Sequence, residues 1–433
     1  MEEDQAAKLR SQLRLQVSDR REAIIQAAQK LVAAPSPCPP GNTTLAAAVA
    51  IQLLKEAIPG IQITHHITDA GIMNVVACIS SGRPGKRLVF NGHLDTFPLG
   101  EDLKWTMPPT GGVVKDGRLY GRGISDMKGG IAASIVAATV LSENRDAWSG
   151  EIVLTLAGDE ESMGKQGTKW LLDNVEKATG DAMICGDAGS PRVIRFGEKG
   201  VVWVDIEAVG TPAHGAHVHR GVNAIDRLRK ALDEVCELER APINAPQEVS
   251  DAINAARDIS ESLSGAGESD TLQRITVNTG TIKGGVSPNL IPSSAMAQCD
   301  IRIPVGVSTD FIEKRLKQVL EPMAGISWRI LRTSEPNYTS PNEEICRLTE
   351  MVSTEVLGQQ AVCNMRVGAS DSRWYRAANV PTVVVGCTPN NMGAADEYVE
   401  IDELVNISQI HTIVAYEFLK NNVLHQSLTA IIR

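Results

Sequence analysis

The segment NGHLDTFPLG, residues 91–100, places His93 and Asp95 two positions apart at the end of a short apolar run. A short apolar run that ends in glycine is typical of a buried strand. Side chains at positions i and i+2 lie on one face of an extended chain, so these two side chains should emerge together where the strand meets its loop. A histidine that binds a metal usually donates its other ring N–H to a carboxylate. Asp95 is therefore placed either to orient His93 or to bind a metal itself.

Three further acidic segments follow at comparable places in the chain. They contain Asp126 in GRGISDMKGG, Asp159, Glu160 and Glu161 at the end of EIVLTLAGDEES, and Asp187 in CGDAG. Taken singly, each has an ordinary explanation, because an aspartate before a helix is a common cap and adjacent carboxylates are common in solvated loops. Adjacent carboxylates also repel one another unless a cation or a proton intervenes. Sites in open α/β sheets collect outside the carboxyl ends of strands, so four such chain segments together predict a metallohydrolase.

Strands and helices alternate in the segments that carry these residues. We expect strands near residues 61–66, 73–80, 87–91, 152–157 and 182–185, and helices near 5–33, 43–57, 129–141 and 167–175. The same alternation resumes near the C-terminus, with helices over 342–357 and 402–420 and a strand over 382–386. This alternation is the signature of an α/β fold.

The middle of the chain follows a different order. Strands are expected over 201–209, 274–282, 295–303 and 326–331, and helices over 222–239 and 309–322. The order β-α-β-β-α-β is that of a ferredoxin-like module, into which residues 241–273 are inserted as a partly helical surface segment. We therefore predict a discontinuous α/β catalytic domain, residues 1–199 and 334–433, with an inserted ferredoxin-like α+β sandwich, residues 200–333.

The composition is that of an ordinary globular protein acting on small molecules. The 433 residues are 43% hydrophobic and 22% charged, which is ample for a sizeable core. A formal net charge of −10 argues against a nucleic-acid or anionic-membrane partner. The eight cysteines form no C-x-x-C pair, the first residues lack an apolar signal segment, and the longest apolar stretch, residues 129–141, is too short to span a bilayer. We expect a cytoplasmic protein.

The acidic segments resemble the M20 family of metallopeptidases and deacylases, which includes carboxypeptidase G2, acetylornithine deacetylase, succinyl-diaminopimelate desuccinylase and aminoacylase-1. The resemblance runs from about residue 20 to residue 420. It implies the discontinuous catalytic domain and the inserted sandwich described above. In that family the inserted domain makes the dimer contact, so the resemblance also implies a homodimer.

The resemblance implies a set of metal ligands. His93 would bind one metal, with Asp95 behind it, and Asp187 would join His93 on that metal. Asp126 would bridge two metals, and Glu161 would be a ligand of the first one.

The resemblance also implies two catalytic groups. Glu160 would be the general base. The segment GTPAHGAHVHRGVNAI is similar to the family segment whose histidine enters the partner subunit's active site and stabilises the oxyanion. His214 fits that position, with His217 and His219 as nearby competitors.

Three residues are candidates for binding the substrate. Asn289 in GGVSPNLIP and Arg302 in CDIRIP match, 13 residues apart, a pair that grips a substrate carboxylate in desuccinylase-like members. Arg373 in GASDSRWYR, a stretch similar to one that lines the desuccinylase substrate pocket, is a second candidate.

The terminal motif departs from the family pattern. The family places a histidine ligand of the first metal three residues before an Asp-Glu pair, and in NNMGAADEYVEI that position is Gly393. Neither His411 nor His425 fills the motif position, so the first site keeps only Asp126 and Glu161. An oxygen-rich ligand set shifts preference from zinc towards manganese. We expect one firmly held divalent metal, zinc or manganese, and a second that is weak or absent.

The predicted reaction is metal-dependent hydrolysis of an amide or related C–N bond. The substrate would be a small carboxylate-bearing molecule such as an N-acyl amino acid or short peptide. One alternative is a hydrolytic deaminase or another non-peptide C–N hydrolase on the same scaffold. The other is a non-catalytic binding relative, against which the presence of a base, Glu160, argues.

Overall fold

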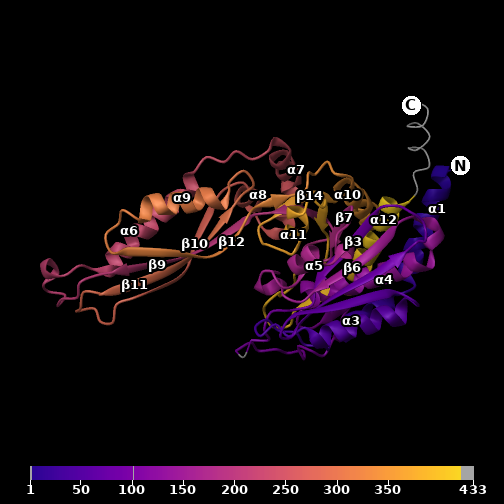
Figure 1. The fold of residues 1–433 in the computed structure, drawn as a ribbon, viewed down its shortest axis with the longest axis horizontal. Helices are drawn as coiled ribbons and strands as arrows, with labels where there is room; N and C mark the ends of the chain where they lie inside the picture. The colour runs from indigo at the N-terminus through magenta and orange to yellow at the C-terminus, as the bar shows by residue number, and fades with distance from the viewer. Residues whose placement is uncertain (1, 101, 421–433) are drawn as a thin grey trace. The chain divides into compact units, whose positions relative to one another are not determined.

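The computed structural model describes residues 2–100 and 102–420, which form two compact units. The first unit contains the described residues up to 196 together with 339–363 and 370–420. The second contains residues 197–338 and 364–369. The chain therefore leaves the first unit and returns to it, as a discontinuous α/β fold requires (Figure 1).

A mixed sheet forms the centre of the first unit. Its strands lie in the order β1 (Gln62–Asp69), β2 (Ile72–Ser80), β6 (Glu151–Ala157), β3 (Arg87–His93), β7 (Ala182–Cys185), β15 (Thr382–Val384) and β8 (Val193–Glu198). The short strands β13 (Asn337–Tyr338), whose residues belong to the second unit, and β14 (Val362–Arg366), which runs into it, both pair with β8. Strands β6, β3, β7 and β15 run parallel to one another. Because parallel strands end at one edge of the sheet, the segments that follow β3, β6 and β7 meet there.

Helices cover both faces of this sheet. On one face lie α1 (Glu2–Ser18), α2 (Arg21–Val32), α3 (Thr44–Ala57), α4 (Gly129–Glu143), α10 (Glu344–Leu357) and α12 (Ile401–Leu419), and on the other lie α5 (Thr168–Asn174) and α11 (Ser372–Ala377). Two consecutive residues of β3 show the two faces. The Phe90 ring stacks on His411 of α12 at 5.5 Å, while the Asn91 amide donates to Thr168 at the start of α5 at 3.2 Å.

The long N-terminal helix expected over residues 5–33 is wrong, because the structure has two helices with a break at Asp19 and Arg20. The Arg20 guanidinium donates to the carbonyl of Gln16 at 2.9 Å, and the Arg20 backbone N–H bonds to Val17 instead. The side chain thus takes the carbonyl that would have continued the helix. A second guanidinium nitrogen of Arg20 bonds to Glu143 of α4, which fixes the break against the core.

Helix α4 is the central core helix of the first unit. Residues 124–143 are long and apolar enough to cross a membrane by length and composition, but 94% of this segment is buried inside the structure. Its first turn approaches the backbone at the end of β7 so closely that a Cβ on Gly130 would overlap the carbonyl group of Gly186. The all-round apolar sequence of this helix therefore reflects burial within the protein.

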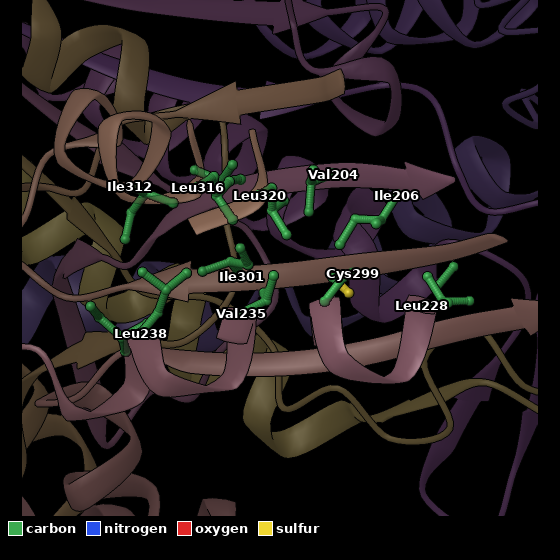
Figure 2. Packing of buried hydrophobic residues seen from close by; sticks show 14 of the residues in the cluster. Val204, Ile206, Leu228, Val235, Leu238, Cys299, Ile301, Ile312, Leu316 and Leu320 are labelled. Atoms are coloured by element: carbon green, nitrogen blue, oxygen red, sulfur yellow. The ribbon is translucent and has the colours of Figure 1, made fainter. Parts of the chain in front are cut away.

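The second unit is a ferredoxin-like sandwich. Its sheet has the order β10 (Thr276–Gly284), β11 (Ser294–Ile303), β9 (Gly200–Val209) and β12 (Ile326–Ser334), with all neighbours antiparallel. Helices α6 (Ala224–Cys236) and α9 (Thr309–Leu320) pack on one face of it, and Figure 2 shows their side chains meeting those of β9 and β11. The alternation along β11, with every second residue buried, provides this apolar face. The inserted segment is mainly helical, with α7 (Gln247–Ser264) and α8 (Glu268–Leu272).

A small sheet that the sequence did not predict joins two distant parts of the first unit. It consists of β16 (Tyr398–Glu400), β5 (Arg118–Tyr120) and β4 (Val113–Lys115). Strands of three residues carry too little periodicity to be recognised from sequence. This sheet matters because it places the terminal motif beside the segment that leads to Asp126.

Candidate active site

Three potential metal ligands meet at the carboxyl edge of the main sheet. His93 is the last residue of β3, Asp187 follows β7 by two residues, and Asp126 lies in the irregular turn Ile124–Lys128 before α4. One ligand atom from each residue lies within 4.8 Å of the other two. His93 Nε2 and Asp126 Oδ1 are 3.0 Å apart. One nitrogen and two carboxylate donors at this spacing fit a single divalent cation.

Asp95 lies behind His93 and organises the next segment. The backbone carbonyl of Asp95 accepts from His93 Nδ1 at 2.9 Å, which leaves Nε2 to face Asp126. The Asp95 carboxylate accepts the backbone N–H groups of Glu160 at 3.2 Å and Glu161 at 3.0 Å. Of the two roles that the sequence left open for Asp95, these contacts favour positioning.

The carboxylates around this centre are short of positive charge. Burial raises the pKa of Glu160 well above its ordinary value, against the opposing charges of His93 and Arg373. Burial, followed by the charge of Asp126, raises the pKa of Glu161 to about 8. Burial alone would lower the pKa of His93, but hydrogen bonds to Asp126 and Asp95 outweigh it and raise that pKa well above its ordinary value. A pocket in which carboxylates resist ionisation for want of a countercharge fits a bound cation.

Arg373 lies beside the expected base. Its side chain is 4% exposed, with Nη1 at 3.6 Å from Glu160 Oε1 and hydrogen-bonded to the Ser370 carbonyl at 2.8 Å. Nη2 lies 3.9 Å from Asp371 Oδ1. Among the residues that the structure describes, Nε and Nη2 of Arg373 have no hydrogen-bond partner. A buried guanidinium with two open donors can receive the two oxygens of a carboxylate.

A network of buried, hydrogen-bonded polar side chains next to Arg373 was not predicted from the sequence. Asp371 accepts from Thr168 at 2.7 Å, and Thr168 accepts from Asn91 of β3 at 3.2 Å. Asn91 also donates to Thr155 at 3.1 Å, which is 2.9 Å from the Tyr375 hydroxyl. The chain ties α11 to the sheet. The polar residues inside the apolar strands β3 and β6 were its only trace in the sequence.

The terminal motif, residues 390–401, contacts residues 106–107 and the segment that leads to Asp126. The Gly393 carbonyl accepts from Arg122 at 3.2 Å, and the Asp396 carboxylate accepts the backbone N–H groups of Thr106 and Met107 at 2.9 and 3.0 Å. Glu397 is buried against the segment that precedes Asp126. Sequence reasoning considered only the missing histidine of this motif and overlooked its acidic pair.

Of the two C-terminal histidines, His411 does not take the place of that ligand. His411 is in the core, where its ring contacts Ser134 at 3.1 Å and the Val385 carbonyl at 2.8 Å. Burial lowers the pKa of His411 to about 4, so its ring is a neutral packing group. His425 lies outside the described residues.

His214 and Asn289 lie together in the second unit. His214 forms a bridge with Leu290, and the Gly215 N–H donates to the Asn289 carbonyl at 2.7 Å. The Ala216 N–H donates to His214 Nδ1 at 3.2 Å. Because Nδ1 accepts, a neutral ring carries its proton on Nε2 and can donate a hydrogen bond from there. The rings of His214 and His217 have centroids 6.0 Å apart, and those of His217 and His219 are 5.9 Å apart.

Arg302 is far from Asn289 within one chain. Asn289 precedes β11, whereas Arg302 is the penultimate residue of that strand. From Ser294 to Arg302 the strand extends by roughly 26 Å at its usual rise. One protomer therefore cannot bring both side chains to one carboxylate. Arg302 is also paired with Asp300, with Nε to Oδ1 at 2.8 Å and Nη2 to Oδ2 at 3.0 Å.

Comparison of the sequence with protein families and known proteins gives a consistent result. The model of peptidase family M20/M25/M40 matches residues 89–417. A succinyl-diaminopimelate desuccinylase from Rhodospirillum centenum is 28% identical over 390 residues, which cover 87% of this chain and 93% of that protein. Another from Roseobacter denitrificans is 30% identical over 362 residues, covering 80% and 87%.

Solved structures share the fold. An M20 family metallo-carboxypeptidase from Sulfolobus solfataricus has a TM-score of 0.77 at 18% identity, covering 91% of this chain and 99% of that one. Human carnosine dipeptidase 1 has a TM-score of 0.75 at 16% identity, covering 95% and 99%.

Proposed function

Because this chain belongs to peptidase family M20/M25/M40 and is a metallohydrolase, we propose that it hydrolyses the amide bond of an N-acyl amino acid or a short peptide. The observation that carries the proposal is the convergence of His93, Asp126 and Asp187 at the sheet edge that also carries Glu160 and Arg373. A base beside a cation centre suits hydrolysis, and a buried guanidinium suits a substrate with a carboxylate.

His93, Asp126 and Asp187 would hold one divalent cation. Bound there, the cation supplies Lewis acidity, which makes a water molecule nucleophilic near neutral pH and polarises the scissile carbonyl. A second cation would have Asp126 and Glu161 but no imidazole, because Gly393 stands at the ligand position. One firmly held ion, with manganese or zinc as the candidates, is our proposal for the stoichiometry.

The protein side chains divide the chemistry. Glu160 would accept a proton from the attacking water and pass it to the leaving nitrogen. His214 of the partner subunit would donate from Nε2 to the developing oxyanion, an interaction typically worth about 3 kcal/mol. Asp95 would keep Nε2 of His93 directed at the cation.

Arg373 would bind a substrate carboxylate. Two relatives of this chain are named succinyl-diaminopimelate desuccinylases, so an acyl group with a carboxylate of its own, such as succinyl, is the first substrate class to test. Arg302 would take part only after exchanging its contact with Asp300 for one with substrate. Asn289 would act from the partner subunit, together with His214.

If His214 and Asn289 act from the partner subunit, the active assembly is a homodimer that forms through the second unit. Exposed apolar side chains gather near His214 and Asn289 and line two adjoining hollows that share Val286 and Leu290, with Val209 in one and Ile225 in the other; Val286 is 91% exposed. Exposed apolar groups that gather in one place commonly mark a protein interface. Strand β10 is also an open edge of the sheet and is exposed along most of its length.

The decisive experiment is Glu160→Gln, assayed with N-succinyl and N-acetyl amino acids and dipeptides in the presence of zinc, manganese or cobalt. We expect loss of turnover with the cation still bound, because the amide keeps the shape of the side chain but cannot accept the proton. Retention of near-normal activity would exclude Glu160 as the base. Release of ammonia in place of an amino acid would assign the chain to another class of C–N hydrolysis.

Cation counting tests the stoichiometry. After dialysis against metal-free buffer, we expect about one equivalent per chain by elemental analysis, because only one set of ligands keeps its imidazole. Two tightly held equivalents would show that the Gly393 position is compensated by another ligand.

A further inference from the structure

Glu397, one of the two acidic residues of the terminal motif, contacts the segment that directly precedes Asp126. Glu397 is 0% exposed and forms an ion pair with Arg122, whose Nη1 lies 2.7 Å from Glu397 Oε2. Oε2 also accepts the Gly123 N–H at 3.1 Å. Oε1 accepts the backbone N–H and the hydroxyl of Ser125, at 3.0 and 2.9 Å. One carboxylate therefore accepts four hydrogen bonds from a four-residue stretch.

Asp126 follows that stretch directly, in the irregular turn Ile124–Lys128. The backbone of Asp126 has φ −134° and ψ 89°, and Met127 after it is also non-helical. Gly123 has φ +77°, and a Cβ there would overlap Thr96, so the backbone approaches its neighbour without room for a side chain. The Lys128 N–H donates to the Gly123 carbonyl at 2.8 Å and the Gly129 N–H donates to the Ile124 carbonyl, which closes the turn around Asp126. The bonds to Glu397 hold residues 122–125, directly before Asp126, and so fix the start of this turn.

Arg122 completes this support. Its second terminal nitrogen donates to the Gly393 carbonyl at 3.2 Å, and its guanidinium lies over the Trp105 ring at 4.9 Å. A buried ion pair of Arg122 with Glu397 and a part-buried hydrogen bond to Gly393 thus join the terminal motif to the Asp126 segment, although the motif offers no imidazole at position 393.

We propose that Glu397 is a positioning residue for the cation centre. Its carboxylate holds residues 123–125 so that Asp126 meets His93 and Asp187. The inference rests on the proposed cation centre. It assigns to the terminal motif of this chain a role in cation binding that does not require a ligand at position 393. Glu397 itself touches neither cation nor substrate.

The test is cation binding by the full-length protein in the absence of substrate. Calorimetric titration with Mn²⁺ and the visible spectrum of the Co²⁺-loaded protein should be compared for the wild type and Glu397→Gln. In the variant one carboxylate oxygen becomes an NH₂ group, so two of the four donors lose their acceptor whichever way the amide lies. Because support residues behind metal ligands typically contribute 10–100-fold, we expect Mn²⁺ affinity to fall by about that factor and the Co²⁺ spectrum to change.

Two further variants make the test independent of folding. Ser125→Ala removes a single donor to Glu397 and should weaken Mn²⁺ binding by about 3- to 10-fold. Glu403→Gln is the matched control, because Glu403 also holds a loop by two hydrogen bonds, but these come from Thr388 and not from residues 122–125. It should leave Mn²⁺ affinity within about twofold of the wild type.

Each outcome decides between the two proposals. Wild-type Mn²⁺ affinity in folded Glu397→Gln and in Ser125→Ala, with an unchanged Co²⁺ spectrum, would overturn the role of Glu397. Asp187→Asn separates this from failure of the centre itself. If Asp187→Asn binds Mn²⁺ as well as the wild type, the proposed centre is wrong, whereas loss of binding in that variant leaves Glu397 as the point under test.

Discussion

At the scale of single residues, the most unusual group is the Arg373 guanidinium. A buried positive charge is normally balanced on all sides, yet two of its nitrogens have no hydrogen-bond partner among the described residues. Its contacts to Glu160 at 3.6 Å and Asp371 at 3.9 Å are longer than hydrogen bonds. Such a group favours binding of an anionic ligand. The guanidinium is already desolvated in the folded protein, so binding does not have to pay that desolvation free energy again.

Replacing Arg373 by Gln should raise the KM for N-acyl amino acids by about 30-fold or more, the usual cost of breaking a buried charge pair. Steady-state kinetics on the free acid and on its methyl ester measure the effect. The ester serves as the matched control, since it offers no carboxylate and should lose little. An equal loss on both substrates would mean that Arg373 is structural and does not bind the carboxylate.

The sequence pointed to His93, Asp126 and Asp187, which the structure brings together, but not to the residues that support them. His93 and Asp187 stand at strand ends, where the chain pattern itself reveals a shared edge. Glu397 meets Ser125 across 272 residues, and Asp371 meets Thr168 across 203. No spacing along the chain encodes such contacts. The pair Asn289 and Arg302 shows the converse limit, since two residues only 13 apart in the sequence lie before the start and near the end of one strand.

At the scale of elements, the close packing of α4 on the end of β7 determines where two of the candidate ligands lie. Asp126 precedes α4, Asp187 follows β7, and the backbones touch at Gly130 and Gly186. Glycines in a segment such as GRGISDMKGG commonly allow unusual backbone conformations near a ligand. At Gly130 the structure shows a different reason, which is helix–strand contact.

Gly130→Ala should therefore destabilise the fold by about 1–3 kcal/mol, because the new methyl group must push the helix away from the Gly186 carbonyl. It should also weaken cation binding, since Gly186 directly precedes Asp187. Urea unfolding of the metal-free protein and Mn²⁺ titration provide the measurements. Gly280→Ala is the control, because a Cβ there meets nothing closer than 3.7 Å. Equal stability of the two variants would contradict the close contact.

Helix α12 carries a pH-dependent contribution to stability. Burial lowers the pKa of His411 to about 4, whereas in the unfolded chain it is near 6.5. Between these values the unfolded chain binds a proton that the folded one refuses, so the free energy of unfolding falls as the pH falls. The contribution is fully present above pH 6.5 and amounts to about 3 kcal/mol lost by pH 4.

Chemical denaturation of the metal-free protein between pH 7.5 and 4.5 tests this contribution. His411→Gln should show a shallower loss of stability over that range than the wild type. The matched control is His65→Gln on the exposed strand β1, which should follow the wild-type profile. If His411→Gln also follows the wild-type profile, His411 does not resist protonation as its burial implies.

The elements themselves followed from periodicity where they were long. The ferredoxin-like order and the helix α4 were predictable because runs of ten or more residues carry a clear pattern. The N-terminal helix was not, because its break depends on the Arg20 side chain reaching Glu143. The three-residue strands β4, β5 and β16 depend on pairing with each other.

At the scale of the whole molecule, the two units divide the proposed chemistry. The first unit holds His93, Asp126, Asp187 and Glu160, and the second holds His214. Such a division makes function depend on assembly, and C₂ symmetry would give each site the partner's histidine. A chain that binds a cation fully could then still be inactive as a monomer.

Mixing two inactive variants tests this dependence. We expect Glu160→Gln and His214→Ala each to lack activity alone, whereas co-expression should restore about a quarter of wild-type activity, since half of randomly formed dimers are mixed and each has one intact site. The intact site lies in the His214→Ala chain and receives His214 from the Glu160→Gln partner.

A mixture of Glu160→Gln with the double variant Glu160→Gln/His214→Ala must stay inactive. His217→Ala and His219→Ala in place of His214→Ala identify which of the three histidines acts. Absence of activity in the first mixture, with dimers confirmed by light scattering, would mean that His214 does not act across the interface.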